Sequence, residues 1–173
     1  LLSGKKFVIG NQLALSSTTL GSTVVNSSLT SVGTLTSLTV NGNSELGGRV
    51  VEKTLGTWTS SLTPNAGVAT ISLATSNTVL YQPAASPINT WKFTNLNLDP
   101  NRAFTVTVIL DANTAATYGD ACEVDGAAIS TGVQWSGGSP PSPTANIDML
   151  TFLIVKDGNG DVKVFGQGNT DFS

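Results

Sequence analysis

The stretch Ala103-Phe104-Thr105-Val106-Thr107-Val108-Ile109-Leu110 alternates apolar side chains with threonines at a period of two. Because successive side chains of a β-strand point to opposite faces, Phe104, Val106 and Val108 share one face and the threonines share the other. Phenylalanine, valine and threonine are all favoured in strands. The pattern therefore predicts a half-buried strand, and it is the strongest strand signal in the chain.

Weaker signals of the same kind lie on both sides of this stretch. They predict further strands at residues 67–73, 78–81, 90–96, 121–124, 127–129, 132–135, 147–156 and 161–166. The pair Asp125-Gly126 predicts a type I′ turn, and Asp157-Gly158-Asn159-Gly160 predicts the hairpin that joins the last two strands. About eight short strands with no helical pattern favour an all-β fold, and specifically an antiparallel, jelly-roll-like β-sandwich as a head domain over residues 51–173.

The aromatic residues indicate where the hydrophobic core lies. All of them except Phe7 follow residue 50. Because large aromatic side chains dominate core burial, the core is expected in the second part of the chain. The predicted core aromatics are Trp91, Phe93, Phe104, Trp135, Phe152 and Phe165.

The first fifty residues show a different pattern. Within residues 28–40, apolar side chains recur at every third position, namely Leu29, Val32, Leu35 and Leu38. A strand needs period two, and on an α-helix four such positions would spread over about half the circumference. Period three fits a chain that winds about a threefold axis and turns one apolar side chain inward per triplet. One chain alone would leave these side chains exposed.

Residues 1–50 are therefore predicted to form an intertwined trimeric β stalk, with those four residues as its core. The alternative is a flexible linker rich in serine and threonine. The regular spacing of leucine and valine favours the trimer, because a linker has no use for a row of apolar side chains.

Composition argues against several classes of function. The net charge is −3 and only 11% of residues are charged, so nucleic-acid binding is not expected. The chain has no histidine, which excludes histidine-based triads and zinc sites that need it. Its one cysteine, Cys122, cannot form an internal disulfide and is expected to be a buried, unreactive thiol. No apolar run approaches the length of a membrane span, so membrane insertion is not expected.

Two acidic patterns are candidates for sites of chemistry. Glu123 and Asp125 stand two apart, but glycosidase carboxylates face each other from different elements. Residues 157–161 resemble the opening of a calcium loop, yet Val162 and Gly168 stand where such a loop needs glycine and glutamate. A hairpin explains the same residues. We therefore expect no enzymatic activity, no metal and no cofactor.

Tyr118 and Trp135 are the weak candidates for ligand contact. With the Gly/Ser/Pro-rich loop 136–143 they could form a platform for a saccharide, since sugars stack on aromatic faces. The favoured alternative is that Trp135 lies in the core and Tyr118 on the surface.

Two parts of the chain resemble phage proteins. Residues 15–42 are similar to the stalk repeats of tailed-phage fibre proteins, particularly those of marine cyanophages. Residues 90–170 resemble a recurrent cyanophage virion domain, most distinctively at Gln134-Trp135-Ser136-Gly137-Gly138. The resemblance implies a homotrimeric structural protein of the virion, a tail or neck fibre that contacts other virion proteins and could contact a host-surface glycan or receptor. A capsid decoration protein and a carbohydrate-binding adhesin module are the alternatives.

Overall fold

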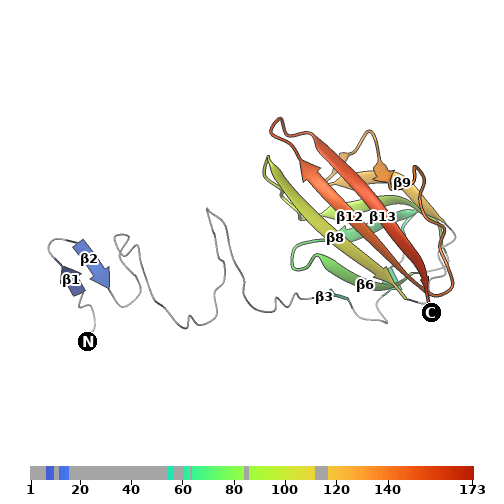
Figure 1. Cartoon of the computed structure of the whole chain (residues 1–173), viewed down its shortest axis with the longest axis horizontal. Helices are drawn as coiled ribbons and strands as arrows, with labels where there is room; N and C mark the ends of the chain where they lie inside the picture. The colour runs from blue at the N-terminus through green and yellow to red at the C-terminus, as the bar shows by residue number, and fades with distance from the viewer. Residues whose placement is uncertain are drawn as a thin grey trace. The chain divides into compact units, whose positions relative to one another are not determined.

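The structure, a computed structural model, describes residues 7–9, 12–15, 54–56, 61–62, 64–83, 86–111 and 117–173 (Figure 1). The chain divides into two compact units, Leu1–Gly48 and Arg49–Ser173. In the first unit, β1 (Phe7–Ile9) and β2 (Gln12–Leu15) form an antiparallel pair. The four predicted stalk-core residues, Leu29, Val32, Leu35 and Leu38, lie outside the described residues, so the trimeric stalk stays a prediction.

The second unit is called the head below. Every element that the structure describes in it is a β-strand. They are β3 (Thr54–Leu55), β4 (Ser61–Leu62), β5 (Val68–Ser72), β6 (Thr78–Pro83), β7 (Ile88–Thr94), β8 (Arg102–Leu110), β9 (Tyr118–Val124), β10 (Ala127–Ala128), β11 (Val133–Trp135), β12 (Ile147–Lys156) and β13 (Val162–Phe172). The predicted all-β class is confirmed for the described ranges. None of these ranges contains a helix long and apolar enough to cross a membrane.

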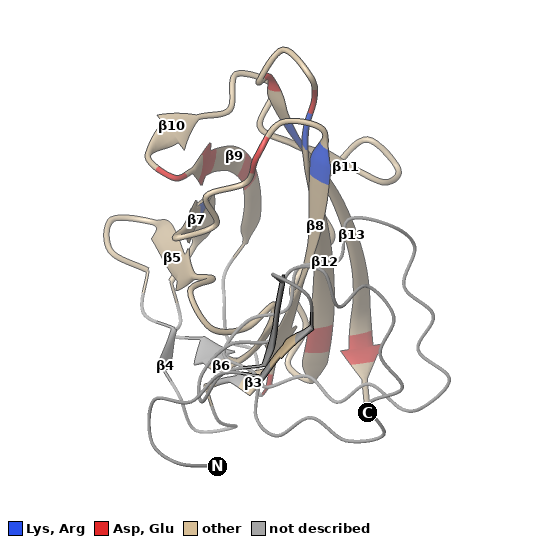
Figure 2. Ribbon diagram, turned by 90° about the vertical axis from the view of Figure 1, so that its left-hand side faces the viewer, with Lys and Arg blue, Asp and Glu red and all other residues tan. Residues whose placement is uncertain are grey.

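The strands of the head form two sheets. One has four strands in the order β10-β9-β7-β5, and the other has seven, in the order β11-β13-β12-β8-β6-β3 with β4 also paired to β6. Figure 2 shows β5, β7 and β9 on one side and β8, β12 and β13 on the other. The sheets meet through aromatic rings: Phe152 of β12 lies 5.1 Å, centroid to centroid, from both Trp91 and Phe93 of β7.

The predicted antiparallel pairing is wrong for much of the head. The pairs β5–β7, β7–β9 and β6–β8 are parallel, as is the pair β11–β13. The reason is that successive strands from β5 to β9 alternate between the two sheets. Neighbours within one sheet are then two steps apart along the chain and run in the same direction. Both sheets are therefore mixed, and the jelly-roll-like connection is not confirmed.

The two predicted hairpins are confirmed. Asp125 and Gly126 have φ angles of 47° and 86°, and a type I′ turn requires positive φ at both of its central residues. This turn pairs β9 with β10. The turn from β12 to β13 is organised by the Asp157 side chain, because its Oδ1 accepts hydrogen bonds from the amides of Asn159 and Asp161, each at 2.9 Å.

The core lies between the sheets and contains most of the predicted aromatics. Trp91, Phe93, Trp135 and Phe152 are buried, and Phe104 packs against them while partly exposed. The prediction for Phe165 is wrong, because its side chain is 42% exposed. On β13 the period of two turns Val164 inward and Phe165 outward.

Candidate functional site

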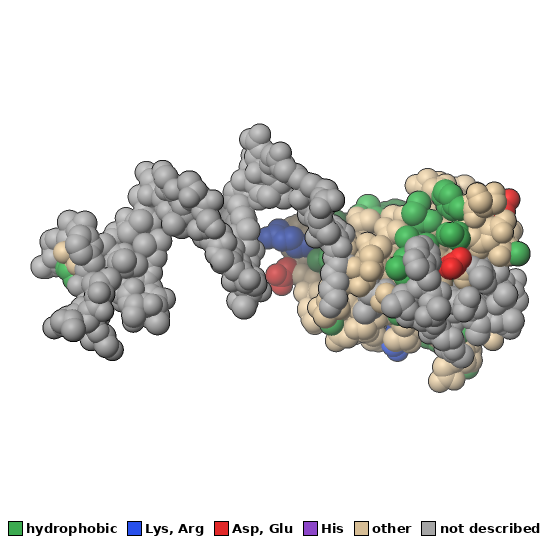
Figure 3. All heavy atoms as spheres, turned by 90° about the horizontal axis from the view of Figure 1, so that it is seen from below, with side chains coloured by type: hydrophobic (Ala, Val, Ile, Leu, Met, Phe, Trp, Pro, Cys, Tyr) green, Lys and Arg blue, Asp and Glu red, His purple; other side chains and the backbone are tan. Residues whose placement is uncertain are grey.

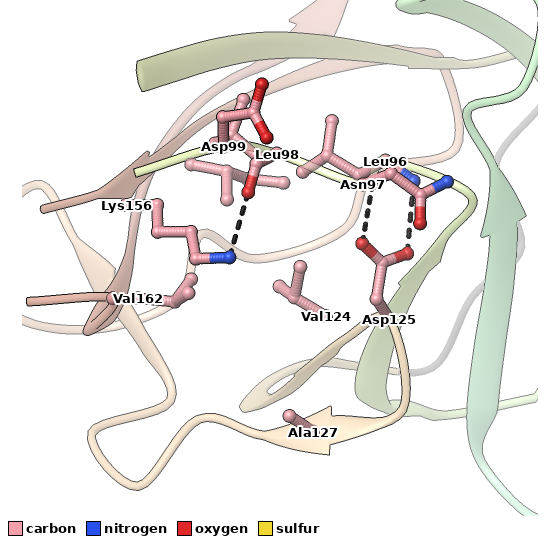
Figure 4. A pocket seen from close by; sticks show the side chains of 11 residues that line it. Leu96, Asn97, Leu98, Asp99, Val124, Asp125, Ala127, Lys156 and Val162 are labelled. Carbon is pink, nitrogen blue, oxygen red and sulfur yellow. Dashed lines mark hydrogen bonds between the residues drawn. The ribbon is translucent and has the colours of Figure 1, made fainter. Parts of the chain in front are cut away.

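One end of the head carries a hollow of about 500 Å³, called the end pocket below (Figure 4). It lies where the segment between β7 and β8 meets the β9–β10 turn and the β12–β13 hairpin. The lining residues are Leu96, Asn97, Leu98, Asp99, Val124, Asp125, Ala127, Ile154, Lys156, Gly160 and Val162. Segments from both sheets thus converge on one concave surface.

The wall of the end pocket is a loop with an unusual backbone. Asn95, Asn97 and Asn101 have φ angles of 61°, 47° and 57°. Asparagine is among the few residues that enter this left-handed region readily, which explains three asparagines within seven positions. The carboxylate of Asp125 accepts hydrogen bonds from the amides of Leu96 at 3.0 Å and Asn97 at 2.8 Å. Asp125 therefore clamps the loop onto the β9–β10 turn.

The end pocket combines apolar and charged groups. Ile154 is fully buried beneath it, and Leu96, Leu98 and Val162 are partly buried around it. The Nζ of Lys156 donates a hydrogen bond to the carbonyl oxygen of Leu98 at 2.9 Å. Figure 4 shows this ammonium and the Asp125 carboxylate both bonded to the backbone of the same loop. Both charged groups are therefore already engaged in holding the loop wall.

The two carboxylates considered from the sequence do not form a pair. Glu123 accepts an ion-pair contact from the Nζ of Lys92 at 2.6 Å, on the outer side of the four-stranded sheet. Asp125 lies beyond the end of β9, in the turn, and its carboxylate binds the loop that forms the wall of the end pocket. Among the residues that the structure describes, no group of three or more acidic or cysteine side chains could hold a metal ion.

Tyr118 and Trp135 are both buried, with 5% and 7% of their surface exposed. Core burial of Trp135 is confirmed, and it packs edge-on against Phe152 at a centroid distance of 5.5 Å. The expectation of a surface position for Tyr118 is wrong. Neither ring presents an open face on which a saccharide could stack.

Tyr118 is buried because its hydroxyl has a buried partner that sequence reasoning missed. It donates a hydrogen bond to Oδ2 of Asp148 at 2.8 Å. Asp148 is fully buried, and its carboxylate also accepts hydrogen bonds from Thr144 and from the Asp171 amide. Since Tyr118 lies on β9 and Asp148 on β12, this cluster links the two sheets. The sequence did carry a signal that Asp148 is buried. It stands two residues before the inward-facing Leu150, so both side chains lie on the same face of β12.

Cys122 lies on β9 with 3% of its surface exposed, so the predicted buried position is confirmed. Burial, and then the negative charge of Glu123, raise the pKa of its thiol to about 12. Because the thiolate is the reactive form, the thiol is a poor nucleophile at neutral pH.

Comparison with protein-family models, with curated proteins and with solved structures finds no match to this chain.

Proposed function

We propose that the chain is a non-enzymatic structural protein of a virion, the subunit of a homotrimeric phage fibre of the tail or neck. The observation that carries the proposal is the triplet spacing of Leu29, Val32, Leu35 and Leu38. A row of apolar side chains at period three has no partner within one extended chain. Sister copies wound about a threefold axis would cover it.

The energetics of such a stalk are favourable. Fully burying one leucine or valine side chain contributes about 1.5–3 kcal/mol, and each triplet repeats the contribution in three chains. The charge-free stretch between Phe7 and Ser44 lets chains approach closely, because no ion has to be desolvated. The resemblance of residues 15–42 to phage stalk repeats supports the same proposal and the location on a particle.

Sedimentation of the purified full-length chain tests the proposal. We expect a trimer, and we expect Leu35→Asp to weaken trimerisation by about a hundredfold, since a carboxylate cannot enter an apolar axis without its water. The matched control is Thr34→Asp, which places the same charge one residue away, outside the triplet positions. A monomeric wild type, or a Leu35→Asp variant that stays trimeric at low micromolar concentration, would contradict the proposal.

A second candidate function is a binding module for a host-surface glycan or receptor, and the end pocket favours it. Loops at the end of a rigid β scaffold commonly carry such sites. A glycan array probed with the full chain tests this candidate. Binding that is lost in Lys156→Met and kept in Lys163→Met, an exposed lysine outside the end pocket, would favour it. Silence across a broad panel would count against it.

The third candidate is a capsid decoration protein, which shares the virion location implied by the resemblance. Antibody labelling of whole particles in electron micrographs separates the two locations. Label confined to tail or neck supports the fibre, and label spread over the capsid supports decoration.

A further inference from the structure

A hollow of about 440 Å³ lies on the outer side of the seven-stranded sheet, where β11, β13 and β12 run side by side. On β13, Val164 and Gly166 are buried, so the alternate residues Phe165 and Gln167 face outward and line the hollow. The volume lies within the range of about 300–1,000 Å³ that is typical of small-molecule sites. We call this place the outer hollow.

An exposed aromatic ring lines the outer hollow. Phe165 lies between its register partners Gln134 on β11 and Leu153 on β12. Both Phe165 and Leu153 are exposed, although they are large and apolar. Hydrophobic side chains reach the surface of the head in several places, as Figure 3 shows for one face of it. In the outer hollow, such a side chain is an aromatic ring with an amide side chain beside it.

A row of polar side chains runs beside this ring. Gln167 of β13 is the register partner of Thr151 of β12. Ser136 continues the row on the side of β11, because its amide donates a hydrogen bond to the Gly166 carbonyl oxygen at 2.8 Å and so keeps this residue alongside β13. Alternate residues of a strand are about 6.7 Å apart, so the polar row and the Phe165 ring are separated by about the width of a small cyclic ligand.

The polar groups of the outer hollow are accessible to a ligand. Four of its side chains make no hydrogen bond to any residue that the structure describes, namely Gln134, Ser136, Thr151 and Gln167. The end pocket differs, because its Lys156 and Asp125 already bind the loop wall. Amide and hydroxyl side chains both donate and accept hydrogen bonds. A ligand that displaces water from the outer hollow must therefore offer donors and acceptors in its place.

Charge is absent from the residues that line the outer hollow. The exposed Lys163 stands at the next outward position of β13, but it is not one of the lining residues. An anionic or cationic ligand would therefore find no opposite charge in the hollow itself. A wholly apolar ligand would cover the four polar side chains and leave them with neither water nor a partner, which is costly. The chemistry of the lining favours a ligand that is neutral, partly apolar and rich in hydroxyl groups.

We propose that the outer hollow binds a neutral saccharide. The C–H face of a sugar ring is apolar and can stack on the Phe165 ring, while the hydroxyl groups at its rim can both donate to and accept from the amides of Gln134 and Gln167. The inference goes beyond the proposed fibre, because it concerns the head alone. It rests on the second candidate function, to which it gives a ligand class and a site other than the end pocket.

A glycan array probed with the full-length chain tests the proposal, and calorimetric titration of the best-bound oligosaccharide gives its affinity. The array carries neutral oligosaccharides of glucose, galactose, mannose and N-acetylglucosamine beside sialylated and sulfated ones. Phe165→Thr removes the ring but keeps a residue that favours strands, and it is expected to weaken binding by about tenfold or more. The matched control is Phe172→Thr, which removes another exposed phenylalanine of β13 that does not line the hollow, and it is expected to leave binding unchanged.

A second variant tests the polar row independently of the ring. Gln167→Met removes the amide and keeps the length of the side chain, and the loss of its hydrogen bonds to the sugar is expected to weaken binding by about fivefold to tenfold. Lys156→Met, in the end pocket, is expected to leave the affinity unchanged. Circular dichroism verifies the fold of each variant, and Gln167→Met carries the test should Phe165→Thr fail to fold.

The outcomes separate this inference from the other proposals. Binding of neutral oligosaccharides that is weakened in Phe165→Thr and kept in Lys156→Met supports the outer hollow. Binding that is lost in Lys156→Met and kept in Phe165→Thr overturns the inference and favours the end pocket. Binding confined to sialylated or sulfated glycans, or no binding to any of them, also overturns the inference. The proposed fibre is unaffected by each of these results, because sedimentation measures trimerisation without a ligand.

Discussion

The two sheets of the head share one core but have different outer surfaces. Inward, both contribute fully buried aromatic side chains, with Trp91 and Phe93 from one sheet against Phe152 from the other. Outward, the four-stranded sheet carries Thr70 and the Lys92–Glu123 ion pair, whereas the seven-stranded sheet carries Leu153 and Phe165.

The difference between the two outer surfaces shows which apolar residues are required for folding. The inner surfaces must be apolar, because they drive folding by leaving water. The outer surface of the four-stranded sheet shows that a sheet of this head folds with a polar exterior. The exposed Leu153 and Phe165 of the seven-stranded sheet are therefore not required by the core.

The largest expected effect separates the inner and outer surfaces of a single strand. Gly166 is buried on β13, and a Cβ atom there would lie 2.6 Å from both Trp135 and Val133. Gly166→Val is expected to lower the free energy of unfolding by about 3 kcal/mol, because a buried tryptophan cannot move aside. Gln167→Val, the next residue and exposed, is expected to change it by no more than about 0.5 kcal/mol.

Urea unfolding followed by tryptophan fluorescence measures both variants. Equal losses in the free energy of unfolding would mean that β13 does not have one buried and one exposed surface.

An effect of intermediate size tests whether water reaches the inner surface of the four-stranded sheet. The Cys122 thiol has its pKa raised from 9.0 to about 12 by burial and Glu123, so the unfolded chain loses this proton at lower pH than the folded chain. The thiol's contribution to stability is complete below pH 9 and is lost progressively between about pH 9 and 12. At pH 10 the expected loss is about 1.4 kcal/mol.

Unfolding measured from pH 8 to pH 10.5 checks this prediction against Cys122→Ala, which lacks the titrating group and cancels the titration of other residues. Parallel pH profiles for the two proteins would show that water reaches the thiol.

The smallest effect is expected on the polar outer surface. Lys92 and Glu123 are register partners on β7 and β9, joined at 2.6 Å, with about a third of each side chain exposed. Solvent screening leaves such a pair about 0.5 kcal/mol or less of coupling. A double-mutant cycle with Lys92→Ala and Glu123→Ala measures it, and the coupling should shrink further in 1 M NaCl. Coupling above about 2 kcal/mol would mean that this surface is not solvated.

Local sequence patterns were sufficient for individual strands and turns. The alternation at residues 103–110 correctly placed Val106 and Val108 on the inner side of β8, because the period of two is a property of the extended backbone. The Asp125-Gly126 turn was equally predictable, since few residue pairs accept two successive positive φ angles.

The end pocket and the Tyr118–Asp148 contact could not be predicted in this way. Their residues come from strands and loops far apart in the chain, and no local spacing records that they meet. Tyr118 and Asp148 are thirty residues apart, and each resembles a surface residue when considered alone. The Leu96 amide and the Asp125 carboxylate are joined across a similar separation.

The sequence by itself determined that the head is all-β, where its principal turns fall and that Trp91, Phe93, Trp135 and Phe152 belong to its core. Those features follow from steric limits and side-chain periods that act over a few residues. Only the tertiary structure decided that β5 to β9 alternate between sheets, that neighbouring strands are consequently parallel, and that Phe165 lies outside while Gly166 lies under Trp135. Which strands pair, and which side of a strand faces the core, depend on which distant segments bury one another's surface. The packing of the whole head decides this, and no single segment does.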